Sequence, residues 1–82
     1  MFHKVRDVKP YSDDELLVSF INGETKTYCV APLVRKWKAF EPLLSTKGLF
    51  ECVKVDVGGY GVSWNDDIDL SCDELYHNGN SV

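Results

Sequence analysis

The sequence lacks any apolar run near the roughly 18 residues that a membrane-spanning helix requires. Its first residues, Met1 to Asp7, lack the apolar core of a signal peptide. Basic residues are few, because 9 lysines and arginines stand against 13 acidic residues, for a net charge of −4. That balance argues against direct binding of a nucleic-acid backbone. We therefore expect a cytoplasmic protein that spans no membrane, binds no nucleic acid and meets a partner with a basic surface.

Residues that carry catalysis or bind metals are also scarce. The three cysteines, Cys29, Cys52 and Cys72, form no C-x-x-C pair and have no histidine at a ligand-like spacing. The two histidines, His3 and His77, lie near opposite ends of the chain, so the sequence suggests no catalytic triad. We expect buried thiols in a reducing compartment, no metal, no cofactor and no enzymatic activity.

Three aspartates, Asp66, Asp67 and Asp69, resemble part of a calcium-binding loop. The stretch lacks the glycine at the sixth position and the glutamate at the twelfth position that an EF-hand requires. We expect Asp69 instead to stabilise a corner of the chain by accepting backbone N–H bonds.

The clearest local signal is a helix start at Ser71. Ser71 and Glu74 form an S-x-x-E capping box, and Leu70 and Leu75 can form a hydrophobic staple across it. Residues 78–82 cannot continue the helix, because asparagine and glycine dominate there. We expect a single domain over residues 1–77 and a disordered C-terminal tail over residues 78–82.

A β-hairpin is predicted around Asn22 and Gly23, a residue pair that favours a two-residue type I′ turn. Strands over residues 15–21 and 24–30 flank this turn. A two-residue loop pairs Val18 with Thr27 across the hairpin. The predicted core face then consists of Leu16, Val18, Phe20, Thr25, Thr27 and Cys29.

The opposite face of that hairpin carries Leu17, Ile21 and Tyr28, which we predict to form an interaction surface. An exposed apolar patch on a small domain is typical of an interface, and a symmetric dimer is a common way to bury one. We expect a homodimer or a tight hetero-complex through this face. A soluble monomer is the alternative, because polar side chains interrupt the patch.

The middle of the chain predicts a helix over residues 31–40. Leu33, Trp37 and Phe40 fall on one face of that helix, and such a stripe is typical of core packing. An opening strand is predicted over residues 3–9. The helix therefore follows three strands, over residues 3–9, 15–21 and 24–30.

A second hairpin is predicted from strands over residues 49–56 and 60–64, joined at Gly58-Gly59. Gly61 within the returning strand indicates a bulge or a close backbone approach. The resulting order is β-β-β-α-β-β-α. We predict an α+β fold, with an antiparallel or mixed sheet of about five strands and two short helices packed on it.

Several motifs together carry a family resemblance over residues 3–76. They are the segments 16–24, 30–34 and 50–56, followed by Gly61-Val62-Ser63-Trp64, Asp69-Leu70 and Leu75-Tyr76. In these the chain resembles the small bacterial proteins described as domain of unknown function 2442. It departs from their pattern at Cys29, where members carry an aspartate, and at Asn65-Asp66, where they often carry Asn-Gly.

The resemblance implies an α+β domain without an established activity. Members occur alone, beside another small protein, or joined to a helix-turn-helix DNA-binding domain, which suggests a regulatory or antitoxin-like role. We therefore expect a non-enzymatic protein-interaction module whose partner is the product of a neighbouring gene. The alternative is a small-molecule-binding or enzymatic domain with a pocket near Trp64 and Tyr60.

Overall fold

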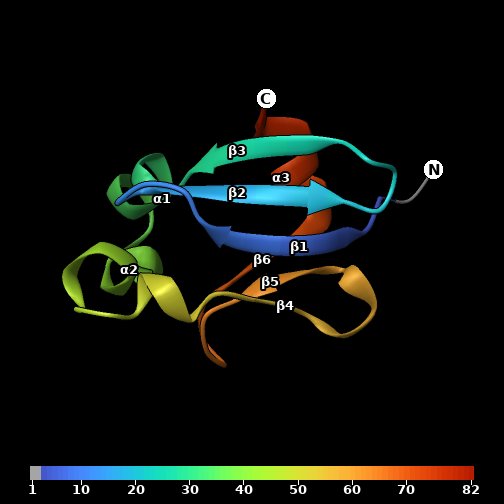
Figure 1. Ribbon diagram of the computed structural model, residues 1–82. Coiled ribbons are helices and arrows are strands. Elements are labelled where there is room, and N and C mark those ends of the chain that lie inside the picture. The colour runs from blue at the N-terminus through green and yellow to red at the C-terminus, as the bar shows by residue number, and fades with distance from the viewer. Residues whose placement is uncertain (1–2) are drawn as a thin grey trace.

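The computed structural model describes residues 3–82 and contains two antiparallel sheets (Figure 1). The first has the strand order β1-β2-β3-β7, formed by β1 (Val5–Pro10), β2 (Glu15–Phe20), β3 (Thr25–Cys29) and β7 (Asn80–Ser81). The second has the order β4-β5-β6, formed by β4 (Lys54–Val55), β5 (Gly61–Ser63) and β6 (Asp69–Ser71). The predicted α+β class is confirmed, with the strands divided between two sheets instead of collected in one.

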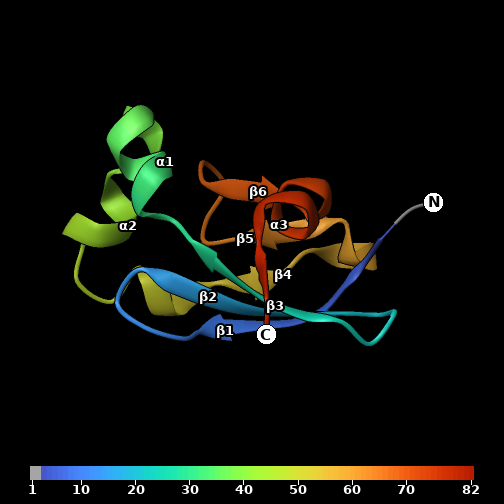
Figure 2. The same cartoon turned by 90° about the horizontal axis from the view of Figure 1, so that it is seen from above.

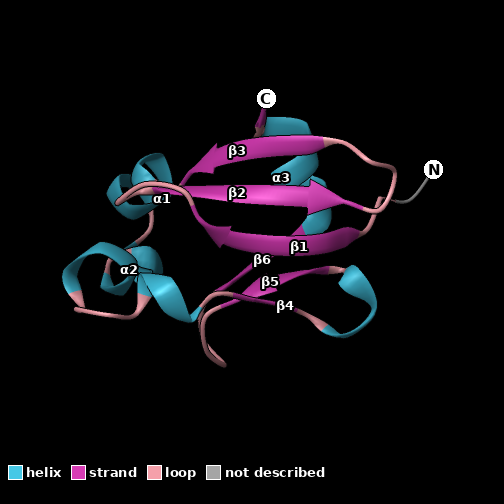
Figure 3. Cartoon of the chain, in the orientation of Figure 1, coloured by secondary structure: helices cyan, strands magenta, loops and turns pink. Residues whose placement is uncertain are grey.

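Short helical segments make most of the connection between the two sheets (Figure 3). They are α1 (Ala31–Lys36), the 3₁₀ helix η1 (Lys38–Phe40), α2 (Pro42–Ser45) and the 3₁₀ helix η2 (Phe50–Cys52). A further 3₁₀ turn, η3 (Val57–Gly59), connects β4 to β5, and α3 (Cys72–Asn78) follows β6. Within residues 3–82, no helix has the length and apolar character needed to cross a membrane.

The core lies between the first sheet and the layer formed by α3 and the second sheet. Figure 2 shows α3, β5 and β6 on the same side of the β1-β2-β3 sheet, and α3 contacts β3, β5 and β6. The two sheets meet where β1 lies against β4 and β5. The buried side chains are Val5, Val8, Leu16, Val18, Phe20, Tyr28, Val30, Leu43, Phe50, Val62, Trp64, Ile68, Leu70, Cys72 and Leu75.

Helix α3 begins where the capping box predicts. The Ser71 hydroxyl accepts the backbone N–H of Glu74 at 3.1 Å, and the side chains of Leu70 and Leu75 are both buried. The N-cap bond satisfies one of the free N–H groups of the first turn, while the two leucines attach the helix to the core. A helix of seven residues is stable because of this packing and not by itself.

The hairpin between β2 and β3 has a different register from the one predicted. The backbone N–H of Phe20 donates to the carbonyl of Glu24, so the loop contains three residues, 21–23. Gly23 alone in this loop has a positive φ, of 95°, whereas a type I′ turn requires positive φ at Asn22 as well. A shift of one residue moves every side chain of the partner strand to the other face. Leu16 therefore pairs with Tyr28, and the ring of Tyr28 enters the core.

The C-terminal segment that we predicted as a disordered tail forms the edge strand β7. Asn80 pairs with Thr27 and Ser81 with Lys26, and the backbone N–H of Val82 donates to the carbonyl of Thr25 at 3.1 Å. The prediction considered only that the helix must end. It missed that α3 ends beside the open edge of β3, whose backbone groups accept a further strand.

The predicted helix over residues 31–40 is interrupted at Trp37. Trp37 has an extended conformation, with φ −127° and ψ 121°, which separates α1 from η1. The predicted buried stripe is therefore wrong at its centre, because the side chain of Trp37 is 52% exposed. Phe40 and Leu33 are only partly buried against the core.

The second predicted hairpin is present in shortened form. Residues 50–52 form the 3₁₀ helix η2, in which the Cys52 N–H donates to the Leu49 carbonyl. Of the strand predicted over residues 49–56, only β4 (Lys54–Val55) pairs with β5. The close approach at Gly61 is confirmed, since a Cβ at this position would collide with the backbone carbonyl oxygen of Leu70 on β6.

Candidate functional site

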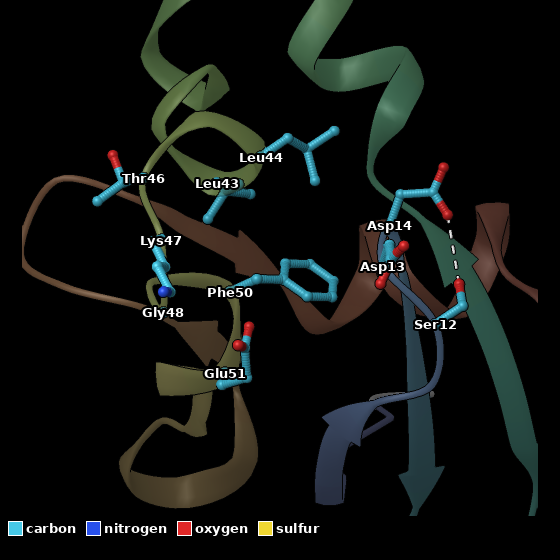
Figure 4. Close-up of a pocket in the computed structure, with 10 residues that line it drawn as sticks. All are labelled: Ser12, Asp13, Asp14, Leu43, Leu44, Thr46, Lys47, Gly48, Phe50 and Glu51. Carbon is cyan, nitrogen blue, oxygen red and sulfur yellow. Dashed lines mark hydrogen bonds between the residues drawn. The ribbon is translucent and has the colours of Figure 1, made fainter.

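An open groove of about 670 Å³ lies at one end of the molecule (Figure 1 and Figure 4). The turn between β1 and β2 forms one wall, α2 and the loop after it form the other, and η2 forms the floor. The lining residues are Ser12, Asp13, Asp14, Leu43, Leu44, Thr46, Lys47, Gly48, Phe50 and Glu51. Figure 4 shows the ring of Phe50 between the two walls.

The acidic wall is held by a network within the β1–β2 turn. Tyr11 N–H donates to the carbonyl of Glu15 at 2.8 Å, which closes the turn. The Ser12 hydroxyl lies 3.3 Å from an oxygen of Asp14 and 3.0 Å from an oxygen of Glu15. The carbonyl of Asp14 accepts the N–H of Val30, which attaches the turn to the chain leaving β3. These bonds hold the backbone of the turn and contact the Asp14 carboxylate of this wall.

The apolar floor and the opposite wall rest on the core. Pro42 starts α2 at a position where its missing N–H costs nothing, and Leu43 on this helix is 1% exposed. Phe50 is 5% exposed, and its ring stacks on Trp64 with a centroid distance of 6.3 Å. The indole N–H of Trp64 donates to the carbonyl of Phe50 at 3.1 Å. Trp64 thus fixes both the backbone and the ring of the groove floor.

The groove combines apolar surface with an excess of negative charge. Three carboxylates, those of Asp13, Asp14 and Glu51, stand against one amine, that of Lys47. Leu44 adds an apolar side chain that is 43% exposed. This chemistry suits a ligand that presents both an apolar group and positive charge. Among the lining residues there is no histidine or cysteine that could act as a base or nucleophile.

The residues that we predicted as pocket residues lie elsewhere. Trp64 is 4% exposed and supports the groove from behind, while Tyr60 is 66% exposed and lies beside the amine of Lys4, 5.4 Å from its ring centre. Neither side chain lines the groove or the smaller pocket between α1 and α3. Neither of these two pockets is the predicted one, so the pocket near Trp64 and Tyr60 stays a prediction.

The predicted interaction surface of Leu17, Ile21 and Tyr28 is not a single surface. Tyr28 is 4% exposed on the core face, because the three-residue loop shifts the register of β3. Leu17 remains on the outer face, opposite Thr27, and Ile21 lies in the hairpin loop with 61% of its side chain exposed. The homodimer stays a prediction. The face that it would bury has one apolar residue fewer than predicted, because Tyr28 lies in the core.

Tyr28 has a structural role at the edge of a second, smaller pocket of about 290 Å³ between α1 and α3. Its hydroxyl donates to the Glu74 carboxylate at 2.7 Å. Burial raises the pKa of Tyr28 far above its ordinary value, and the bond to Glu74 and the charge of that carboxylate raise the pKa further. This bond attaches the first turn of α3 to β3.

Tyr28→Phe should lower the free energy of unfolding by about 1–3 kcal/mol at neutral pH, because the Glu74 carboxylate loses the hydrogen bond from the Tyr28 hydroxyl. The folded state favours the protonated phenol, so the contribution of Tyr28 is complete below the ordinary tyrosine pKa of about 10. It is lost as the pH rises above that value toward the raised pKa of the folded protein. Urea unfolding, followed by circular dichroism from about pH 7 to about pH 11, measures this difference.

The exposed Tyr60→Phe variant is the control for this experiment. It should follow the wild type at every pH. A gap between wild type and Tyr28→Phe that stays constant through the alkaline range would contradict the proposed origin of the stability.

A cluster of aromatic side chains joins the two ends of the described chain. The rings of His3 and Tyr76 stack at a centroid distance of 3.5 Å, and His77 lies 6.5 Å from His3. The amine of Lys26 lies 3.9 Å from the centre of the Tyr76 ring. Tyr76 donates a hydrogen bond to Glu24, and this bond raises the pKa of Tyr76 and lowers the pKa of Glu24. Local sequence patterns contain no signal for this cluster, because Tyr76 lies 52 residues from Glu24 in the chain.

Of the three cysteines that we expected to be buried, only Cys72 is, because Cys29 is half-buried and Cys52 is exposed. Cys72 is buried, and burial followed by the charge of Asp73 raises the pKa of its thiol, so the reactive thiolate is disfavoured. The corner near the aspartates is held by Asn65, whose side-chain oxygen accepts the N–H groups of Asp67 and Ile68 at 2.8 and 2.9 Å. The prediction had assigned this function to Asp69. Across residues 3–82, no three His, Cys, Asp or Glu side chains gather in a metal-binding group.

Comparison with known proteins gives one result. A family model described as "Protein of unknown function (DUF2442)" matches residues 5–81. No curated protein and no solved structure matches the chain. The family match includes both sheets, α3 and the edge strand β7. The chain therefore belongs to the DUF2442 family of proteins of unknown function.

Proposed function

We propose that this protein is a non-enzymatic interaction module that regulates a partner protein by binding it, in the manner of an antitoxin. The observation that carries the proposal is the groove, which is open, has buried apolar side chains at its floor, and carries carboxylates on the β1–β2 turn and on η2. An open groove suits an extended stretch of another chain, whereas sites for small ligands enclose most of the ligand surface.

The charge of the whole chain supports the same proposal. A net charge of −4 attracts a basic partner and raises the rate of productive encounter. Antitoxin-like action requires nothing more than tight binding that covers the working surface of the partner. The groove supplies polar and apolar contacts for such binding, and its lining contains no histidine or cysteine.

A second function, the binding of a small molecule, has one observation in its favour. The groove volume of about 670 Å³ falls within the range of roughly 300–1,000 Å³ of small-molecule sites. The partner experiment below separates the two functions, because a small-molecule domain does not need to form a complex with a protein.

Co-expression with the product of a neighbouring gene tests the proposed function. We expect the two proteins to co-purify and to elute from gel filtration as one complex. If the role is antitoxin-like, expression of the neighbour alone should slow growth, and co-expression of this chain should restore it. Separate elution of the two proteins, together with growth that does not depend on this chain, would overturn the proposal.

A further inference from the structure

The groove has the features of a peptide-docking site. Its floor is apolar, with Leu43 and Phe50 buried and Leu44 exposed at 43% near the rim. An apolar side chain inserted here would cover Leu44 and contact the ring of Phe50. Burial of one large apolar side chain contributes most of the affinity of a short docked segment.

Carboxylates on one wall and on the floor restrict which segment can dock. Asp13 and Asp14 lie on the turn between β1 and β2, and Glu51 lies on η2 across the groove floor (Figure 4). Asp13 and Glu51 are exposed, so their charges are available to a partner. Lysine or arginine beside the apolar anchor would meet the carboxylates of the turn and of the floor, away from Lys47 on the α2 side, whereas an acidic segment would be repelled by those carboxylates.

The groove is formed before binding, which lowers the cost of docking. One wall is attached through the bond from Val30 to the Asp14 carbonyl, and the floor is attached through the bond from the Trp64 indole to Phe50. Little backbone has to be ordered when a segment binds, so most of the contact energy is retained as affinity.

We propose that the groove between the β1–β2 turn and α2 binds a segment of the partner protein in which an apolar side chain is flanked by lysine or arginine. This inference rests on the proposed function, and it adds the surface used and the chemistry of the partner. The segment docks with its apolar side chain on Phe50 and Leu44 and with its cations toward Asp13 and Glu51.

Titration of the isotope-labelled protein with short peptides, followed by amide NMR spectra, tests this proposal. The probe is a peptide of alternating leucine and lysine, and the control is a peptide of alternating leucine and glutamate. We expect the basic peptide to shift amide signals of residues 12–14 and 43–51, and to bind more weakly as the salt concentration rises. Signals that move uniformly over the surface, or equally with both peptides, would overturn the proposal.

Two charge-reversed variants supply the matched comparison. Asp13→Lys with Glu51→Lys reverses two exposed carboxylates of the groove, while Asp66→Lys with Asp67→Lys reverses two exposed carboxylates outside it. Both variants change the net charge equally, and a melting curve of each should first show that it is folded. We expect about tenfold weaker peptide binding in the groove variant and little change in the control. Equal loss in both would mean that net charge alone attracts the peptide, which would contradict the groove.

The same variants separate this inference from the proposed function. If the neighbouring-gene product binds the wild type and the groove variant equally well, the protein is an interaction module that uses another surface. If it binds neither, while the basic peptide still occupies the groove, the choice of partner is wrong and the groove assignment stands.

Discussion

Trp64→Ala should leave the protein unfolded at room temperature. Trp64 is 4% exposed, stacks on Phe50 and donates its indole N–H to the Phe50 carbonyl. Truncation of a buried tryptophan costs about 3–5 kcal/mol, and it also leaves the Phe50 carbonyl without this donor. A domain of this size has a stability of only roughly 3–5 kcal/mol. Thermal and urea unfolding, followed by circular dichroism, should show no folded baseline for the variant.

The other tryptophan provides the control. Trp37 is 52% exposed and has no indole hydrogen bond among the side-chain bonds of residues 3–82. Trp37→Ala should change the free energy of unfolding by no more than about 0.5 kcal/mol. A folded Trp64→Ala protein with a melting curve like that of Trp37→Ala would show that the floor of the groove does not depend on Trp64.

Local sequence signals predicted the features that depend on neighbouring residues. Ser71 and Glu74 are three positions apart, and the Ser71 hydroxyl accepts the Glu74 N–H as the capping box predicts, while the Glu74 carboxylate accepts from Tyr28 instead of from the Ser71 N–H. The alternation of Leu16, Val18 and Phe20 likewise predicted the buried face of β2, because side chains alternate along a strand whatever its partner is. Such signals remain valid in any tertiary context that buries the apolar face.

The hairpin register could not be read from the same signals. Asn22-Gly23 suits a two-residue loop, but Gly23 also provides the left-handed residue of a three-residue loop. The choice between them depends on which face of β3 is buried. Tyr28 enters the core and finds Glu74 on α3, a residue 46 positions away, as its hydrogen-bond partner. No window of sequence around the turn contains that information.

The groove was missed for a related reason. Its walls come from residues 12–14 and residues 43–48, and only the tertiary fold brings them together. The sequence held one signal, the consecutive acidic residues Asp13 and Asp14 in the turn before β2. Trp64 was singled out correctly as important, but its importance lies in supporting Phe50 from the core and not in contacting a ligand.

The periodic pattern of Leu33, Trp37 and Phe40 led to a wrong prediction of one buried helix face, for a different reason. Spacing predicts a common face only if the helix continues through all three positions. The extended conformation of Trp37 ends α1 after six residues, so the ring of Trp37 no longer follows Leu33. As a result the Trp37 side chain is exposed, and the amine of Lys36 lies 5.4 Å from the centre of its ring.

Gly59→Ala should destabilise the protein much more than the same change at Gly48. Both glycines have a positive φ, 75° at Gly59 and 82° at Gly48, so alanine is strained at each position. A Cβ at Gly48 would meet no atom within 4 Å, whereas a Cβ at Gly59 would lie 2.7 Å from the carbonyl oxygen of Val5. The two variants therefore share the backbone strain and differ in the collision with β1.

The collision matters because β1 connects the two layers of the fold. Val5 is 2% exposed, and β1 contacts both β2 and β4. To relieve the contact, the start of β1 must move away from η3, which opens the junction between the sheets. We expect a loss of about 1–2 kcal/mol for Gly48→Ala and of about 2–4 kcal/mol for Gly59→Ala, where the steric cost is added to the strain. Urea unfolding of both variants measures the difference, and equal losses would show that β1 yields to the added methyl group without cost.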